Sequence, residues 1–433
     1  MALNKKPYRG CRDFFPENMR VREFLFNQMK KSAEQFGYQP YDGPLLEEVE
    51  LYKAKSGEEL INDQIYSFTD RGERFVAIRP EMTPTLARMI ANIHRQESKP
   101  IRWYSIPNLM RYEKPQRGRV REHWQYNVDI FGAPEAKGEL EILSLIKSFL
   151  CSFGADHSMF AIRINDRAIV DHLMNKMLSL SEEQAYKLYK IIDRSTKVTA
   201  DKLQVMIAEV LSEASEQEIL QSYLKLKDFS ELEAFVMENQ IPAANFIQII
   251  QGAKELGLAD YLQYDPAIVR GLDYYTGMVF EIFDKHPDNN RAIAGGGAYA
   301  NLLKIFNEEP LPGIGFGLGD VTLRDFLESH KLLADFSTQE NDLFLVTTET
   351  EYELKSLAIA NQLRELGARV ETNLEKLKFN KIFKLAEQKG HSKVGILENR
   401  DGTLQVQVKD LNSREINIFK PEEVENIYKA IKG

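Results

Sequence analysis

Cysteine is scarce in this chain: Cys11 and Cys151 are the only two in 433 residues. Two cysteines make neither a disulfide framework nor a metal-binding set, and the seven histidines do not stand at ligand spacing. No run of about 18 apolar residues is present, so we expect no membrane-spanning helix. The first fifteen residues, MALNKKPYRGCRDFF, lack the apolar core of a signal peptide. These absences predict a cytoplasmic protein without a structural metal.

Two common nucleotide-binding motifs are missing as well. The glycine clusters fit neither G-x-x-x-x-G-K-[ST] nor G-x-G-x-x-G, which excludes a P-loop and a Rossmann site. One cluster, 295–297, precedes a segment with helical spacing. In the other, Gly313, Gly315, Gly317 and Gly319 alternate. Because alternating glycine removes the side chains from one face of a strand, we expect a flat ligand to lie against bare backbone there.

The chain is acidic overall, with 56 Lys and Arg against 65 Asp and Glu. A net charge of −9 argues against a general nucleic-acid binder, so any RNA-binding surface must be a local basic patch. Hydrophobic residues make up 43% and charged residues 28%, as in ordinary soluble proteins. The length suggests about two to four domains.

The segment 102–131, RWYSIPNLMRYEKPQRGRVREHWQYNVDIF, is typical of two strands joined by a loop at 114–118. Side chains alternate along a strand, so the second strand has one polar and one apolar face. The polar face carries Arg121, His123, Gln125, Asn127 and Asp129, and the apolar face carries Trp124, Tyr126, Val128 and Ile130.

The same segment is locally basic. Six Lys and Arg residues between positions 102 and 121 stand against a single acid, Glu113. Guanidinium groups bind phosphate oxygens in pairs, so the pattern indicates a site for a polyanion such as a nucleoside triphosphate. A solvated basic hairpin fits the pattern equally well.

Three segments together carry a resemblance to a known family. The segment 111–132, R-Y-E-K-P-Q-R-G-R-V-R-E-H-W-Q-Y-N-V-D-I-F-G, resembles the second signature motif of class II aminoacyl-tRNA synthetases, in the form found in the histidyl-tRNA synthetase family. The segments 79–83, R-P-E-M-T, and 270–277, R-G-L-D-Y-Y-T-G, resemble that family too. The resemblance implies that a homodimer activates L-histidine with ATP and Mg²⁺ and transfers it to tRNA(His).

The resemblance also assigns candidate site residues. Those expected to bind histidine are Glu81, Thr83, Arg111, Gln125, Asp129, Arg270, Tyr274 and Tyr275. Those expected to bind ATP are Arg111, Glu113, Arg119 and His123, and the catalytic pair is Arg111 and Arg270. Asp129 and Tyr275 would each meet one imidazole nitrogen, because each ring nitrogen needs its own partner. Adjacent tyrosines in a strand face opposite ways, so we expect at most one of Tyr274 and Tyr275 in the pocket.

The chain departs from the family pattern at four places. Asp129 replaces the usual Glu, His123 replaces the usual adenine-stacking Phe, and 297–300 reads Gly-Ala-Tyr-Ala in place of Gly-Arg-Tyr-Asp. Thr322 stands where the third motif usually has an arginine that meets the ATP phosphates. The resemblance leaves Arg270 and the arginines of the 102–121 segment to supply that charge.

The predicted organisation has three parts. Residues 1–330 form an α+β catalytic core, a class II antiparallel sheet flanked by helices, which an all-helical insertion at 166–265 interrupts. A polar linker at 331–341 leads to residues 342–433, a three-layer α/β domain with a mostly parallel sheet that resembles an anticodon-binding domain. The insertion would touch the tRNA acceptor arm or serve as a spacer.

One alternative belongs to a different functional class. A catalytically silent paralogue, such as the regulatory subunit of ATP phosphoribosyltransferase, resembles the same catalytic domain. Such subunits typically lack the anticodon domain and the signature at 270–277, both of which are expected here. A class IIa synthetase for another amino acid is disfavoured by the same signature.

Overall fold

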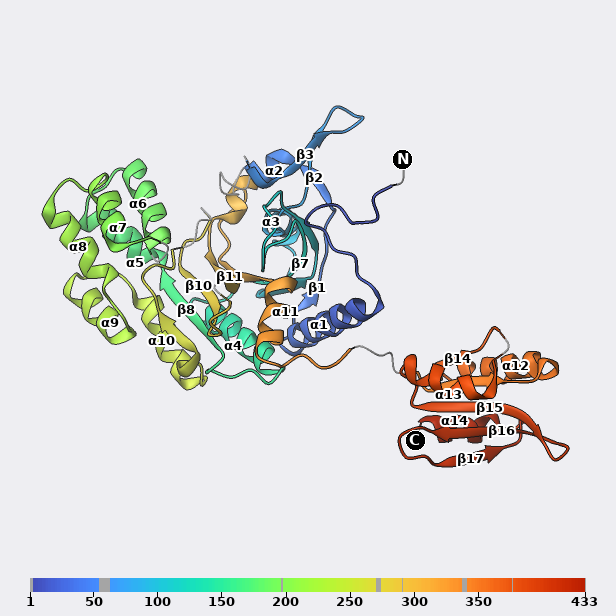
Figure 1. Cartoon of the computed structure of the whole chain (residues 1–433). Coiled ribbons are helices and arrows are strands. Elements are labelled where there is room, and N and C mark those ends of the chain that lie inside the picture. The colour runs from blue at the N-terminus through green and yellow to red at the C-terminus, as the bar shows by residue number, and fades with distance from the viewer. Residues whose placement is uncertain are drawn as a thin grey trace. The chain divides into compact units, whose positions relative to one another are not determined.

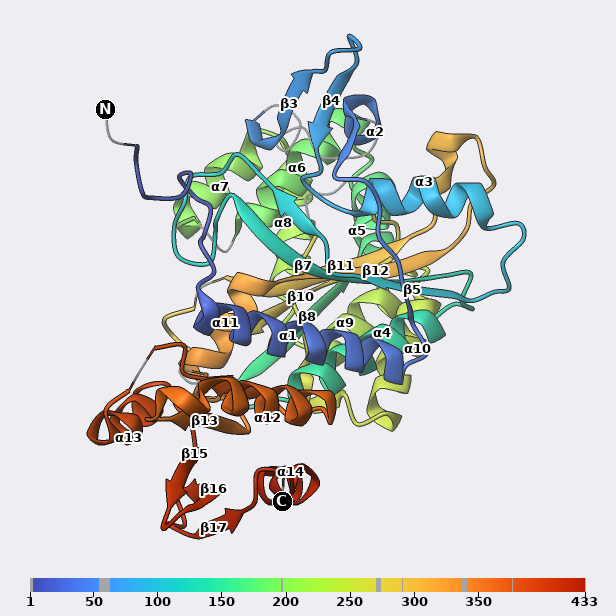
Figure 2. The same cartoon turned by 90° about the vertical axis from the view of Figure 1, so that its right-hand side faces the viewer.

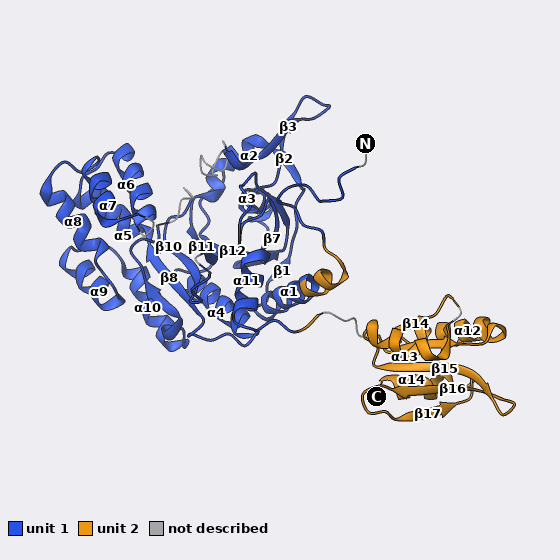
Figure 3. Cartoon of the chain, viewed as in Figure 1, with its two compact units in different colours: residues 1–13, 22–334 blue, residues 14–21, 335–433 orange. Residues whose placement is uncertain are grey.

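The computed structural model describes residues 3–53, 63–195, 198–269, 274–289, 291–336, 341–375 and 377–432. The chain forms two compact units (Figure 3). The first comprises residues 1–13 and 22–334, and the second comprises residues 14–21 and 335–433.

A nine-stranded sheet is the centre of the described part of the first unit (Figures 1 and 2). The strand order is β1-β5-β7-β12-β11-β10-β8-β9, and β6 pairs with β7. The pairs β1–β5 and β8–β9 are parallel, and all other pairs are antiparallel. The strands are β1 Gln39–Pro40, β5 Ile101–Ser105, β6 Asn108–Met110, β7 Glu122–Phe131, β8 Phe160–Asp166, β9 Leu262–Tyr264, β10 Met278–Asp284, β11 Ala292–Tyr299 and β12 Gly313–Gly319.

Strand β7 alternates as its sequence predicts. Tyr126, Val128 and Ile130 are at most 1% exposed on the face that helices cover. The hydroxyl of Tyr126 lies 2.9 Å from that of Ser32 on helix α1, and its ring packs on Phe149 of α4. The helices around the sheet are α1 Pro16–Gln35, α3 Thr83–Ile93, α4 Lys137–Cys151, α11 Asp320–Ser329 and the 3₁₀ helix η5 Leu302–Phe306. Helix α2 Val49–Lys53 packs on a second, smaller sheet. A three-stranded sheet of order β2-β4-β3 contains the hairpin of β3 and β4. Its strands are β2 Leu46–Glu48, β3 Tyr66–Thr69 and β4 Phe75–Ile78.

The segment with helical spacing forms the 3₁₀ helix η5 after the glycine cluster at 295–297, and the cluster itself lies inside strand β11. A strand survives there because β11 is hydrogen-bonded to β10 and β12 on its two sides, and this pairing outweighs the low strand propensity of glycine.

Helices dominate the chain between β8 and β9. They are α5 Arg167–His172, the π-helix η2 Leu173–Met177, α6 Glu182–Arg194, α7 Ala200–Ala208, α8 Ala214–Leu224, α9 Phe229–Glu238, α10 Ala244–Glu255 and the 3₁₀ helix η4 Ala259–Tyr261. Helix α6 begins with a capping box, in which Ser181 and Gln184 each accept a backbone N–H. Strands β8 and β10, on either side of this helical segment in the sequence, pair directly in the central sheet.

The second unit contains a five-stranded sheet of order β14-β13-β15-β16-β17. Its helices pack on both faces, with α12 and α14 in one apolar core and α13 in another. The elements are β13 Leu343–Thr347, the 3₁₀ helix η6 Thr350–Tyr352, α12 Glu353–Glu365, β14 Val370–Thr372, α13 Phe379–Gln388, β15 Lys393–Arg400, β16 Thr403–Asp410, β17 Ile416–Phe419 and α14 Val424–Lys432.

This sheet is mixed, so the expected mostly parallel pairing holds for only half of it. Strands β14, β13 and β15 are parallel, whereas β15–β16 and β16–β17 are antiparallel. The reversal occurs at Asp401-Gly402, where both residues have positive φ, the geometry of a two-residue hairpin turn.

Candidate active site

A cavity of about 820 Å³ opens on the polar face of the central sheet. Strand β7 contributes His123 and Gln125 to its wall. The loop before β7 contributes Arg111, Glu113, Gly118, Arg119 and Val120. The remaining wall is Arg163, Asp193, Asp265, Ala267, Ile268, Glu281, Phe283, Arg291, Ala292, Ile293, Ala294, Gly295, Gly317, Gly319, Val321 and Thr322. The structure therefore brings five of the predicted residues together in one cavity: Arg111, Glu113, Arg119, His123 and Gln125.

The alternating glycines of β12 make room for side chains of β7. A Cβ at Gly315 would collide with the carboxylate of Asp129, and one at Gly317 would stand 2.7 Å from Cδ of Gln125. The expectation of a ligand against bare backbone is thus wrong at Gly315 and at Gly317, where a neighbouring side chain of β7 covers each glycine. Gly317 and Gly319 do line the cavity.

Asp129 is buried beside Tyr299, the last residue of β11. The hydroxyl of Tyr299 donates to Oδ1 of Asp129 at 2.5 Å. Burial raises the pKa of Asp129 to about 7, and the hydrogen bond from Tyr299 opposes this rise. Burial also raises the pKa of Tyr299, so the phenol keeps its proton. Asp129 Oδ2 takes no part in this hydrogen bond, which leaves it available to a further N–H donor.

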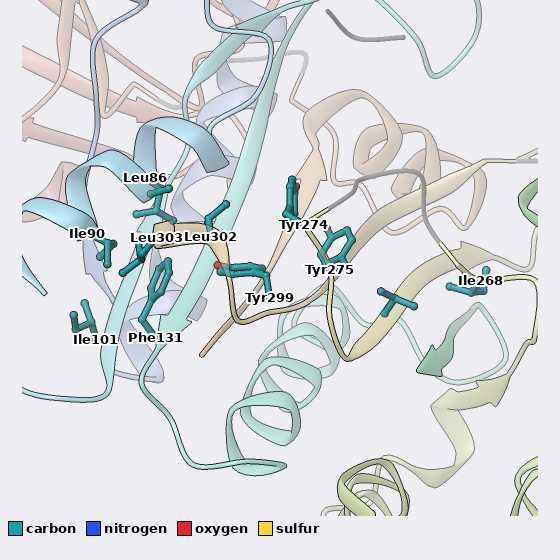
Figure 4. Close-up of a cluster of buried hydrophobic side chains, with 12 residues drawn as sticks. Leu86, Ile90, Ile101, Phe131, Ile268, Tyr274, Tyr275, Tyr299, Leu302 and Leu303 are labelled. Atoms are coloured by element: carbon teal, nitrogen blue, oxygen red, sulfur yellow. The ribbon is translucent and has the colours of Figure 1, made fainter. Parts of the chain in front are cut away.

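Tyr274 and Tyr275 belong to the same buried cluster as Tyr299 (Figure 4). Their ring centroids are only 4.7 Å apart, and Tyr274 meets the Tyr299 ring edge-on at 6.0 Å. The expectation that the two tyrosines face opposite ways is wrong, because they precede strand β10 and so escape the alternation of a strand. Tyr275 covers Gly297, where a Cβ would stand 2.7 Å from its ring.

The loop before β7 holds three of the cavity's charged groups, Arg111, Glu113 and Arg119. Nε of Arg111 donates to the carbonyl of Pro80 at 2.8 Å, which ties this loop to the segment 79–83. Nε of Arg119 lies 2.7 Å from Oε2 of buried Glu113. Burial, together with the positive charges of Arg111 and Arg12, lowers the pKa of His123 to about 3. The imidazole of His123 is therefore a neutral ring at pH 7, suited to stacking.

Of the remaining predicted residues, those that the structure describes do not line this cavity. Glu81 is buried, and Thr83 begins helix α3. The buried cluster around Tyr299 contains Tyr274 and Tyr275, and Asp129 lies beside it. Arg270 falls outside the described residues, so the structure places only Arg111 of the predicted catalytic pair.

Two residues that the sequence analysis did not select belong to this region. Arg291 lines the cavity just before β11, and Tyr299 holds Asp129. The tyrosine that the chain shares with the family's Gly-Arg-Tyr-Asp segment was a signal for Tyr299. Arg291 gave no signal, since it stands alone outside every motif.

Within the described ranges, no group of three His, Cys, Asp or Glu residues is arranged to hold a metal ion. No helix in that part of the chain is both long and apolar enough to cross a membrane.

The central sheet and the motif residues along its cavity are those of a class II aminoacyl-tRNA synthetase. The family model described as histidyl-tRNA synthetase matches residues 10–322. The histidine–tRNA ligase of Leptospira biflexa is 43% identical over 421 residues, which cover 95% of this chain and 94% of that relative. The chain therefore belongs to the histidyl-tRNA synthetase family.

Other comparisons agree with this assignment. The relative from Arabidopsis thaliana, named as the chloroplastic/mitochondrial histidine–tRNA ligase, is 35% identical and covers 94% of this chain and 83% of its own length. A solved histidyl-tRNA synthetase from Nostoc sp. PCC 7120 matches with a TM-score of 0.81 at 22% identity, over 99% of this chain and all of that chain. The predicted fold class is confirmed.

A solved protein from Bacillus halodurans, described as an ATP phosphoribosyltransferase regulatory subunit/histidyl-tRNA synthetase, also shares the fold. It matches with a TM-score of 0.75 at 20% identity, over 92% of this chain and 99% of its own. The fold alone therefore does not separate the ligase from the regulatory alternative.

Proposed function

We propose that this chain is a histidine–tRNA ligase. In the first step a carboxylate oxygen of histidine attacks the α-phosphorus of ATP, and pyrophosphate leaves. In the second step a ribose hydroxyl at the end of tRNA(His) attacks the carbonyl carbon of the adenylate, and AMP leaves. The observation that supports this most is that strand β7 carries His123 and Gln125 on the cavity wall and, further along the same face, Asp129, which accepts from Tyr299.

On this proposal the cavity binds ATP and the α-amino end of histidine. Neutral His123 stacks on adenine, and Glu113 accepts from the adenine amino group. Arg119 meets the distal phosphates, exchanging its contact with Glu113 for a phosphate oxygen. Arg111 neutralises charge at the reacting carboxylate and α-phosphate, which is electrostatic stabilisation of the transition state. We assign the same role to Arg270 and the α-amino contacts to Glu81, Thr83 and Gln125 from the sequence alone.

The imidazole of histidine is assigned to the buried cluster. Oδ1 of Asp129 accepts from Tyr299, so Oδ2 remains to accept from one ring N–H. The hydroxyl of Tyr275 would then donate to the other ring nitrogen, with the ring of Tyr274 packed beside that of Tyr275. A site that satisfies both ring nitrogens rejects side chains that lack them, because buried polar groups would be left unpaired.

In this proposal each part of the chain has its own role in the reaction. The core within residues 1–330 activates histidine, the helical insertion at 166–265 touches the acceptor arm of the tRNA or spaces it, and the domain at 342–433 binds the anticodon. Mg²⁺ would enter with ATP and neutralise its phosphates, and two copies of the chain would form the active homodimer. A cytoplasmic location stays a prediction from the sequence, since one relative is named as chloroplastic/mitochondrial.

Aminoacylation tests the proposal against the regulatory alternative. Purified protein, ATP, Mg²⁺, labelled histidine and total tRNA should yield acid-precipitable label on tRNA(His). The proposal fails if folded protein that binds both histidine and ATP charges no tRNA. A regulatory paralogue would give that result.

A further inference from the structure

Arg291 stands where two cavities meet. It lines the 820 Å³ cavity and a second cavity of about 380 Å³. The two cavities share Gly118, Arg291, Ile293 and Thr322 as common wall. Arg291 directly precedes strand β11, so the paired sheet fixes its backbone. A side chain at this junction can reach a ligand in the larger cavity without any movement of the sheet.

In the part of the chain that the structure describes, the guanidinium of Arg291 has no ion-pair partner. Among the described residues it makes no hydrogen bond and no ion pair within 4.0 Å. Burial and the positive charge of Arg119 lower its pKa, and Glu113 opposes this effect. Glu113, however, already stands 2.7 Å from Nε of Arg119. Glu113 is thus already engaged by Arg119, and an anion in the cavity would give the guanidinium of Arg291 a partner.

Other arginines near the cavity are already engaged. Arg163 lies 3.3 Å from Asp265 and over the ring of Phe283, and Arg12 pairs with Asp320 at 2.8 Å. Arg291 is therefore the better placed of these cations to accept a new anion.

Arg291 and Thr322 converge on one point beside the loop that precedes β7. The position of a Cβ on Gly118 is 3.2 Å from Cδ of Arg291 and 3.7 Å from Cγ2 of Thr322. Gly118 has a φ of +70°, a conformation that favours glycine. Because glycine has no Cβ, the stem of the Arg291 side chain can lie against it. The hydroxyl of Thr322 donates to the carbonyl of Ile293 at 2.9 Å, so its polar end is turned to the backbone. Arg291 fills the space that a longer side chain at position 322 would need.

We propose that Arg291 binds the phosphate chain of ATP, supplying from β11 the positive charge that the family usually supplies from position 322 on α11. The inference rests on the proposed function, because it assumes that the larger cavity receives ATP. It differs from the expectation that Arg270 and the arginines of the 102–121 segment suffice. The chemistry required is that of an arginine against phosphate oxygens, which neutralises charge and fixes orientation together.

Equilibrium binding of two nucleotides tests this assignment without any turnover. In Arg291→Ala the dissociation constant of Mg-ATP should rise about 10- to 100-fold, the usual effect of losing a hydrogen bond to a charged group. The dissociation constants of AMP and of histidine should stay close to wild type, because neither ligand carries the distal phosphates. Arg324→Ala is the matched control: it removes an arginine from α11 that pairs with Glu328 on the surface.

A second variant asks whether the two positions serve the same phosphates. Arg291→Ala combined with Thr322→Arg should recover most of the ATP affinity, whereas the same Thr322→Arg change in the wild-type background should not raise it. If Arg291→Ala is unfolded at the temperature of the binding measurement, Arg291→Gln, which keeps the aliphatic part of the side chain, is measured in the same way.

Three results would overturn the inference. They are unchanged ATP affinity in Arg291→Ala, equal losses for ATP and AMP, and no recovery in a folded double variant. Failure of the proposed function is seen separately, as wild-type protein that binds ATP but supports no histidine-dependent reaction.

Discussion

Asp129 is the residue on which selectivity for histidine depends in our proposal. Its carboxylate is buried, accepts from Tyr299 and keeps one oxygen for a ring N–H. Asp129→Asn keeps the size of the side chain but replaces the anionic acceptor. We predict that it raises the KM for histidine about 10- to 100-fold, the usual cost of a charge-assisted hydrogen bond.

The KM for ATP should change little in this variant, because Asp129 lies outside the cavity assigned to ATP. Steady-state pyrophosphate exchange at saturating levels of the other substrate measures both constants. Equal increases in both would mean that Asp129 holds the sheet together and does not read the imidazole.

Asp129 also predicts how stability depends on pH. Its pKa is about 7 in the folded chain against 3.8 for an ordinary Asp, so the folded state holds the proton more tightly. The stabilisation that Asp129 contributes is therefore fully present below about pH 4 and is lost as the pH rises to about 7. Without histidine, the Tm of wild type relative to that of Asp129→Asn should fall across this range and level off above it. A difference in Tm that is constant with pH would contradict the raised pKa.

Single residues also mark the limit of prediction from sequence. His123, Gln125 and Glu113 were selected because they sit in a long contiguous motif, and the structure places them on one cavity. The side-by-side packing of Tyr274 and Tyr275 was not predictable, since it depends on where β10 begins. Arg291 was overlooked for a similar reason. Its position depends on β11 running beside β12, and that pairing joins segments far from the hairpin motif.

At the scale of elements, strands β12 and β7 pair so that the glycines of β12 make room for the site residues of β7. Gly315 pairs with Asp129 in the sheet and leaves room for its carboxylate. Gly315→Ala would push a methyl group into that carboxylate and into the carbonyl of Val128, 2.7 Å from the new Cβ. Overpacking of this kind costs about 1–3 kcal/mol, so we predict a lower Tm and a higher KM for histidine.

Gly72→Ala is the control for Gly315→Ala. It lies in an exposed turn between β3 and β4, where the nearest atom to a new Cβ is a side-chain oxygen of Asp70 at 3.3 Å. Thermal unfolding and histidine kinetics compare the two variants. If Gly315→Ala behaves like Gly72→Ala, the close packing of β12 on Asp129 is not required.

Strand and helix patterns were informative where one face is buried. The alternation in β7 and the hairpin of β3 and β4 follow from local sequence and turn chemistry. The mixed sheet of the second unit results from two chain reversals after the strand–helix alternation. The first is the Asp-Gly turn at 401–402 between β15 and β16, and the second joins β16 to β17. The glycine strand β11 could not be recognised at all, because only pairing on both sides makes it a strand.

At the scale of the molecule, the division into units predicts a separable function. The described strands of the second unit form a sheet of their own, with apolar cores on both faces. Deleting residues 342–433 should leave histidine activation measurable, since every residue assigned to the cavity lies before position 323. Transfer to tRNA should fall sharply if this unit binds the anticodon. Equal aminoacylation with and without the segment would contradict that role.

The central claim is that the cavity and the Asp129–Tyr299 pair together activate histidine. ATP–pyrophosphate exchange, measured with each of the common amino acids in turn, tests it most directly. We predict exchange with histidine alone, dependent on Mg²⁺ and greatly reduced at subsaturating histidine in Asp129→Asn. Exchange with a different amino acid, or none at all from protein that binds both histidine and ATP, would contradict the claim.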